Sequence, residues 1–118
     1  MEILDYGPAT GRAIEAYGSK GLTAKAVVRG DELAVTVLRV AAGGEIGRHP
    51  APVNQVMLVS AGSGSVRSGD GEWQPVVAGQ AVLWRAGEDH TTRAIEDLTL
   101  VVLEMEGLEP LRQPAAGG

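Results

Sequence analysis

The 118-residue sequence contains no cysteine, which excludes disulfide bonds, thiolate metal sites and a cysteine nucleophile. Histidine is almost as scarce, with two residues in the whole chain. The N-terminal segment MEILDYGPATGR lacks the basic start and apolar core of a signal peptide. No apolar run approaches the roughly 18 residues of a membrane helix. We therefore expect a cytoplasmic protein with no membrane partner, held together by packing.

Clusters of basic residues are also missing. The ten Lys and Arg residues are scattered singly among fifteen acidic residues, and the formal net charge is −5. No basic patch is available to contact phosphate backbones, so nucleic acid is not an expected partner. The common motifs for phosphate binding, dinucleotide binding and serine or zinc hydrolysis are absent as well.

The composition indicates a folded chain, since 44% hydrophobic and 21% charged residues are unlike the composition of disordered proteins. A length of 118 residues corresponds to about one ordinary domain. We expect a single domain over residues 1–118, with a core over about 22–106. The last stretch, 107–118, mixes Pro, Gly and Ala and is expected to be a flexible tail.

Short apolar runs separated by glycine are the main feature of the sequence. The 17 glycines are typical of many short strands joined by tight turns. The clearest hairpin joins LTAKAVV (22–28) to ELAVTVLRVAA (32–42) through a turn at Gly30. Helical spacing is weak, and only RAIEAYG (12–18) fits a helix or a strand equally. The pattern predicts an all-β fold, with further strands at 53–60, 64–68, 72–77, 80–85, 90–95 and 98–106.

The last expected strand, 98–106, is apolar on both faces. Leu100 and Val102 occupy one parity, and Val101 and Leu103 occupy the other. A strand of this kind is usually buried on both sides. Because a twofold interface is the commonest contact between identical subunits, we expect a second copy to cover one face and the protein to be a homodimer.

The first histidine stands in GGEIGRHPAPVNQVMLVSAG (43–62), a segment that resembles the first motif of the cupin family. That motif has glycine, five residues, His, one residue, His, three or four residues, Glu, six residues and glycine. The corresponding positions here are Gly43, His49, Ala51, Gln55 and Gly62, so alanine replaces the second histidine and glutamine replaces the glutamate. The tripeptide around His49, Arg-His-Pro, is by itself typical of an exposed loop.

The second histidine stands in GQAVLWRAGEDHTTRA (79–94), which resembles the second cupin motif. Gly79, Gly87 and His90 match it, while Arg85 replaces a proline and Ala94 replaces an asparagine. The resemblance covers roughly residues 30–106. It implies a single-domain jelly-roll cupin β-barrel of antiparallel strands, whose motif residues lie on inner faces around a central pocket.

The resemblance further implies that His49, Gln55 and His90 converge and bind a divalent metal ion, namely Zn, Fe, Mn, Ni or Cu. Two imidazoles and an amide oxygen would leave open positions for a substrate, as catalytic sites require. Gln55 is neutral, however, and amide oxygen is a weaker donor than imidazole for most of these metals. The alternative is that both histidines are hydrogen-bonded core residues of a barrel that has lost its metal.

Four more side chains are candidates for lining the pocket, each with an alternative. Met57 and Trp84 could form apolar walls or belong to the core. Arg85 could contact an anionic ligand or be exposed. Glu104 could act as a base or extra ligand, or form a solvated strand end with Glu106.

Two acidic residues, Glu88 and Asp89, precede His90 directly. Negative charge beside an imidazole favours its protonated form. We therefore expect these carboxylates to raise the pKa of His90, although acidic residues are also ordinary in turns.

Three functions are compatible with these observations. The first is a metal-dependent oxygenase, isomerase or lyase that acts on a small organic metabolite. The second is a metal-free cupin that binds a small-molecule ligand as a sensor or carrier. The third is a dimeric accessory protein with a structural role. The fold alone does not choose among them.

Overall fold

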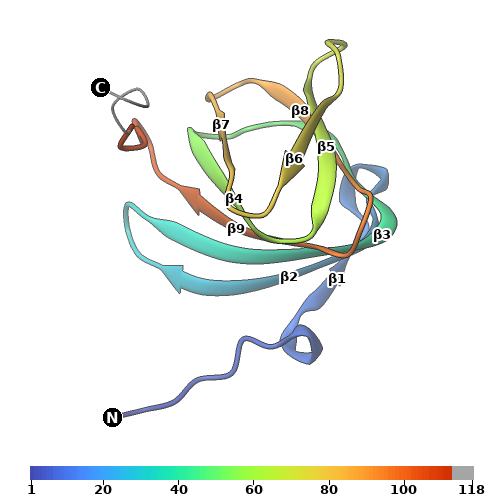
Figure 1. Cartoon of the computed structure of the whole chain (residues 1–118). Coiled ribbons are helices and arrows are strands. Elements are labelled where there is room, and N and C mark those ends of the chain that lie inside the picture. Colours follow the sequence, from blue (N-terminus) through green and yellow to red (C-terminus); the bar gives the residue numbers. More distant parts are fainter. Residues whose placement is uncertain (113–118) are drawn as a thin grey trace, which may run out of the picture.

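A single antiparallel sheet curls into a nearly closed barrel in the computed structural model, which describes residues 1–112 (Figure 1). The all-β antiparallel barrel predicted from the sequence is confirmed. No helix among these residues combines the length and the apolar character needed to span a membrane.

In chain order the elements are the 3₁₀ helix η1 (Pro8–Thr10), β1 (Arg12–Ile14), the 3₁₀ helix η2 (Ala16–Gly18), β2 (Lys20–Arg29), β3 (Ala34–Pro50), β4 (Gln55–Ala61), β5 (Ser63–Ser68), β6 (Gln74–Val77), β7 (Ala81–Trp84), β8 (Asp89–Ala94) and β9 (Leu98–Glu104).

The strands follow the order β6-β5-β8-β3-β9-β4-β7, with β2 paired to β3 and β1 paired to β2. The two ends of this order, β6 and β7, are consecutive in the chain and are joined by a short turn at Ala78–Gln80. Because a three-residue turn links the two edge strands, the sheet comes close to closing on itself.

The longest strand, β3, changes partner halfway along. Its first part, Ala34–Val40, pairs with β9, and its last part, Glu45–Pro50, pairs with β8. Gly43 lies between these parts with φ +80°, a conformation that favours glycine. The sequence predicted that this strand would end at residue 42. That boundary is wrong, because the glycine bends the strand instead of ending it.

The other strands lie close to their expected ranges, and the predicted hairpin between residues 22–28 and 32–42 is present as β2 and β3. The undecided segment 12–18 divides into β1 and η2. Of the expected flexible tail, residues 107–112 make defined contacts: Asn54 Nδ2 donates a hydrogen bond to the Leu108 carbonyl oxygen at 3.0 Å, and Glu109 pairs with Arg85. Residues 113–118 of that tail lie outside the described residues.

The apolar core occupies one end of the barrel. Val40, Leu98 and Leu100 are at most 1% exposed, and burial of each such side chain contributes roughly 1.5–3 kcal/mol. Toward the other end of β9 the inward positions become polar, since Glu104 lies opposite Gln55 of β4. The packed end therefore stabilises a barrel whose opposite end is free to carry polar groups.

Two glycines of the sequence motifs, Gly62 after β4 and Gly79 before β7, allow a matched test of backbone constraints. Both have positive φ, +85° at Gly62 and +95° at Gly79. A Cβ at Gly62 would lie 2.0 Å from the Asp97 carbonyl oxygen, whereas at Gly79 no atom lies within 4 Å. We expect Gly79→Ala to lower the free energy of unfolding by roughly 1–2 kcal/mol, and Gly62→Ala to lower it by more or to prevent folding. Urea unfolding of both variants measures this, and equal losses would contradict it.

Candidate functional site

The two histidines are direct cross-strand neighbours. His49 on β3 lies opposite His90 on β8, and the centroids of the two rings are 4.4 Å apart with an interplanar angle of 52°. His90 is buried at 4% exposure, while His49 is partly exposed. The structure thus brings the two imidazoles, 41 positions apart in the chain, into contact on the inside of the barrel.

A β-bulge in β3 turns His49 inward. Ile46 is buried in the core, and strict alternation would then point residue 49 outward. The register of β3 against β8 shifts between Ile46 and His49, and this extra residue restores the inward direction.

The bulge is fixed by the segment around η2. The Gly47 backbone N–H donates a hydrogen bond to Ser19 Oγ at 3.0 Å. A Cβ at Gly47 would lie 1.7 Å from the Tyr17 carbonyl oxygen. Since the backbone of Tyr17 occupies that space, only glycine fits at this position of the bulge.

Hydrogen bonds to the backbone select the same tautomer for both rings. Nδ1 of His49 lies 2.7 Å from the Gly47 carbonyl oxygen, and Nδ1 of His90 lies 3.0 Å from that of Glu88. A carbonyl oxygen can only accept, so Nδ1 of each ring carries a hydrogen, and in the neutral form of the ring Nε2 keeps its lone pair. Metal-ligating histidines are commonly oriented by the same kind of Nδ1 hydrogen bond.

Burial lowers the pKa of His90 below its ordinary value. The hydrogen bond to the Glu88 carbonyl and the nearby carboxylates of Glu88 and Asp89 act in the opposite direction, but their effect is smaller. The two carboxylates thus raise the pKa, as the sequence suggested, but burial outweighs their contribution. Asp89 also pairs with Arg48 at 3.3 Å, so part of its charge is compensated. The His90 ring is neutral near pH 7.

A cavity of about 130 Å³ lies beside the histidine pair. Gln55 lines it, is 8% exposed, and makes no side-chain hydrogen bond to another described residue. Of the predicted pocket-lining residues, Met57 and Glu104 line the cavity, whereas Trp84 and Arg85 do not. The lining consists of Thr36, Leu38, Ile46, His49, Gln55, Met57, His90, Thr92, Val102 and Glu104.

Two further aromatic rings extend the histidine pair. The Trp84 ring stacks on His90 with centroids 4.5 Å apart, and the Tyr17 ring stacks on His49 with centroids 4.8 Å apart. The four rings form a continuous row that restricts rotation of both imidazoles. No motif in the sequence marks Tyr17, because its contact with His49 depends on the path of η2 over β3. Its φ of +60° is unusual for a residue other than glycine.

Arg85 points away from the cavity. Its side chain is 51% exposed and its guanidinium pairs with the Glu109 carboxylate. Of the two alternatives for Arg85, the structure has the exposed one, because Trp84 faces inward and the next residue along an extended chain faces outward. Glu106 lies beyond the end of β9 and is exposed, so it does not join Glu104 on a strand face.

The donor set beside the cavity consists of two imidazoles and one amide. Within residues 1–112, no group of three or more His, Asp or Glu side chains lies close enough together to hold a metal ion. The residues fit a metal with two neutral nitrogen ligands and the Gln55 amide oxygen, and they leave further coordination positions open.

Comparison with protein families identifies the fold. The model of the cupin domain matches residues 36–106, which include both histidines and most of the barrel. The chain belongs to the cupin domain family. A comparison of this cupin with curated protein sequences found no match.

Solved structures with the same fold are numerous. The polyketide cyclase RemF from Streptomyces resistomycificus has 19% identity and a TM-score of 0.78, covering 95% of this chain and 84% of its own. A predicted oxalate decarboxylase from Thermotoga maritima has 18% identity and a TM-score of 0.74, covering 82% and 92%. An RmlC-like cupin from Shewanella frigidimarina has 22% identity and a TM-score of 0.73, covering 92% and 95%. At these identities the likeness shows the fold alone.

The lowered pKa of His90 is directly measurable. In metal-free protein, we expect the pKa of His90 to lie below the ordinary histidine value of about 6.5. NMR of the ring protons as a function of pH measures this pKa. The His49→Gln variant, which keeps only one histidine, assigns the signals of His90. Because the folded pKa lies below the unfolded one, the unfolded state binds more protons as the pH falls through about 6.5, and stability decreases there. A His90 pKa at or above the ordinary value would contradict this reasoning.

Proposed function

We propose that this cupin binds a small organic molecule in its cavity, next to a divalent metal ion held by the Nε2 atoms of His49 and His90. The Gln55 amide oxygen is the third protein donor. The observation that carries the proposal is the pair of Nδ1 hydrogen bonds to backbone carbonyls, because in the neutral rings they leave the Nε2 lone pairs of two neighbouring imidazoles that both line the cavity.

Several properties of the site support metal binding. Metal ligation needs neutral imidazole, and burial favours that form of His90. The stacked rings of Tyr17 and Trp84 hold the two imidazoles in place, so little side-chain entropy is lost on ligation. Imidazole suits zinc, iron, nickel and copper, and manganese is a further candidate. When bound, such a metal supplies Lewis-acid chemistry of the kind that oxygenases, isomerases and lyases use.

The remaining lining favours a compact ligand. The cavity volume of about 130 Å³ is close to the roughly 150 Å³ of an engineered cavity that binds benzene. Leu38, Ile46 and Val102 supply apolar surface, while Thr92 Oγ1 is buried without a hydrogen-bond partner among the described residues. A ligand with an apolar body and one or two polar groups would satisfy both kinds of surface.

A metal-free ligand-binding cupin is the second candidate. It is favoured by the lack, among the described residues, of a third His, Asp or Glu side chain close to the histidine pair. The similar structures named as a polyketide cyclase and a predicted oxalate decarboxylase differ in the named chemistry, so fold likeness does not select a reaction.

Elemental analysis of protein purified without a histidine tag separates the two candidates. The chain has only two histidines, so His49→Ala/His90→Ala removes every imidazole. We expect near-stoichiometric divalent metal in the wild type and none in the double variant. Absence of metal from the wild type, even after incubation with each candidate metal, would overturn the metal site and leave ligand binding alone.

The variant Gln55→Glu tests the role of Gln55, because it replaces the neutral amide with a carboxylate of nearly the same shape. If its amide oxygen faces the metal, Gln55→Glu adds a carboxylate donor, and metal affinity should rise at least about tenfold, or about 1.4 kcal/mol. Gln74→Glu makes the same chemical change at an exposed position on β6 and should leave affinity unchanged. Isothermal titration with Zn²⁺ and Ni²⁺ measures both. Equal affinities for the two variants would remove Gln55 from the ligand set.

A further inference from the structure

Glu104 lies where the inner cavity opens to the outside. It lines the cavity of about 130 Å³ and also an open groove of about 700 Å³ at the barrel mouth. On one side it is opposite Ala34 of β3, and on the other it is opposite Gln55 of β4. A molecule that moves from the groove into the cavity therefore passes the Glu104 carboxylate.

The groove is lined by acidic residues. Asp31, Glu32 and Glu106 line it together with Glu104, and neither the groove nor the cavity is lined by Lys or Arg. Within the described part of the chain, Glu104 makes no ion pair, although it is partly buried. A positively charged group that enters the cavity from the groove would therefore meet a carboxylate with no cationic side chain beside it.

An unpartnered polar group independently indicates a ligand in the same cavity. Thr92 is 1% exposed and lines the cavity, and its Oγ1 is buried without a hydrogen-bond partner among the described residues. Gln55, at 8% exposure, lines the same cavity. Buried polar groups are usually paired, so the Thr92 hydroxyl is available to a bound molecule.

We propose that the ligand is a compact cationic amine, whose ammonium group pairs with Glu104 while its other end lies toward His49 and His90. This inference rests on the proposed function in one respect, namely that the cavity is the ligand site. Arg85, the residue that could have favoured an anionic ligand, faces solvent.

The test uses three probes of similar shape and different charge: isobutylamine, isobutyl alcohol and isobutyrate. Binding is followed by two-dimensional NMR, on protein as purified and again after treatment with a chelator, so that a carboxylate–metal contact cannot mimic binding. We expect isobutylamine to bind at least about tenfold more tightly than either other probe. Glu104→Gln should abolish that preference.

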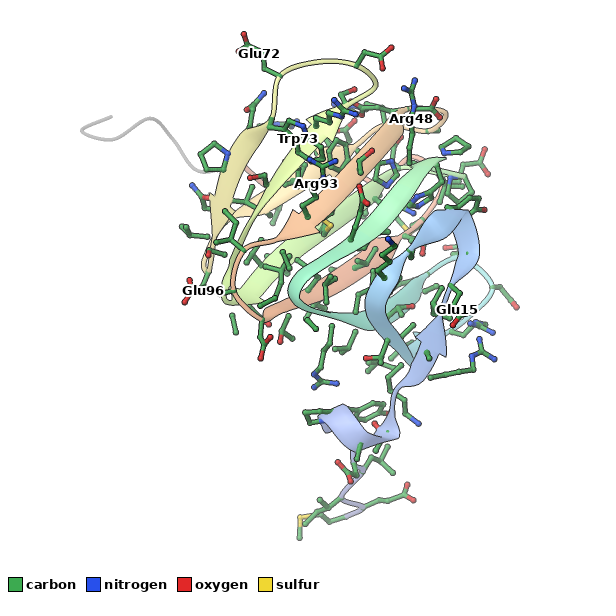
Figure 2. The ribbon with its side chains drawn as sticks, turned by 90° about the vertical axis from the view of Figure 1, so that its right-hand side faces the viewer. Glu15, Arg48, Glu72, Trp73, Arg93 and Glu96 are labelled. Carbon is green, nitrogen blue, oxygen red and sulfur yellow. The ribbon has the colours of Figure 1, made fainter. Side chains whose placement is uncertain are left out.

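The control variant is Glu72→Gln, which changes the net charge by the same amount. Glu72 lies on the β5–β6 hairpin, on the outside of the barrel and away from the cavity (Figure 2), and this variant should keep the preference for the amine. The inference is overturned if the amine binds no better than the alcohol, or if Glu104→Gln retains the preference. Because the chelated sample contains no metal, either result leaves the metal site to be judged by elemental analysis.

Discussion

The contact between the Tyr17 backbone and Gly47 is the constraint on which the site depends. It holds the bulge of β3 against η2, and the bulge decides that His49 faces inward. The Gly47 carbonyl then accepts the hydrogen bond that fixes the His49 ring. One close approach of two backbone segments therefore sets the direction of the side chain, its tautomer and its stacking with Tyr17.

The most completely buried apolar side chains and the cavity lie toward opposite ends of the barrel. Val40, Leu98 and Leu100 fill one end almost completely, and their burial offsets costs at the other. There, Thr92 Oγ1 and Trp84 Nε1 are buried without partners among the described residues, and each such group costs roughly 1–3 kcal/mol. A protein retains such costs where a ligand or water completes the hydrogen bonds, and of these two groups Thr92 lines the cavity.

The strand β9 carries both core and cavity residues. Leu100 and Val102 belong to the apolar core, and Val102 and Glu104 line the cavity. Val101 and Leu103 face the opposite side of the sheet. The alternation of an extended chain therefore places the Glu104 carboxylate on the same face as the core residues before it.

The sequence by itself determined the all-β fold and most strand positions, because strand alternation and turn residues are local properties of the chain. That His49, Gln55 and His90 lie near one another was implied only by the resemblance to the cupin motifs, since a bulge in β3 is needed to turn His49 inward. The sequence did not determine that β3 continues through Gly43 to Pro50, since a positive-φ glycine can end a strand or bend it. The contact of Tyr17 with His49 and the net lowering of the His90 pKa were decided by tertiary structure alone. Both depend on which segments pack together and exclude water, and this is a property of the folded barrel rather than of any stretch of sequence.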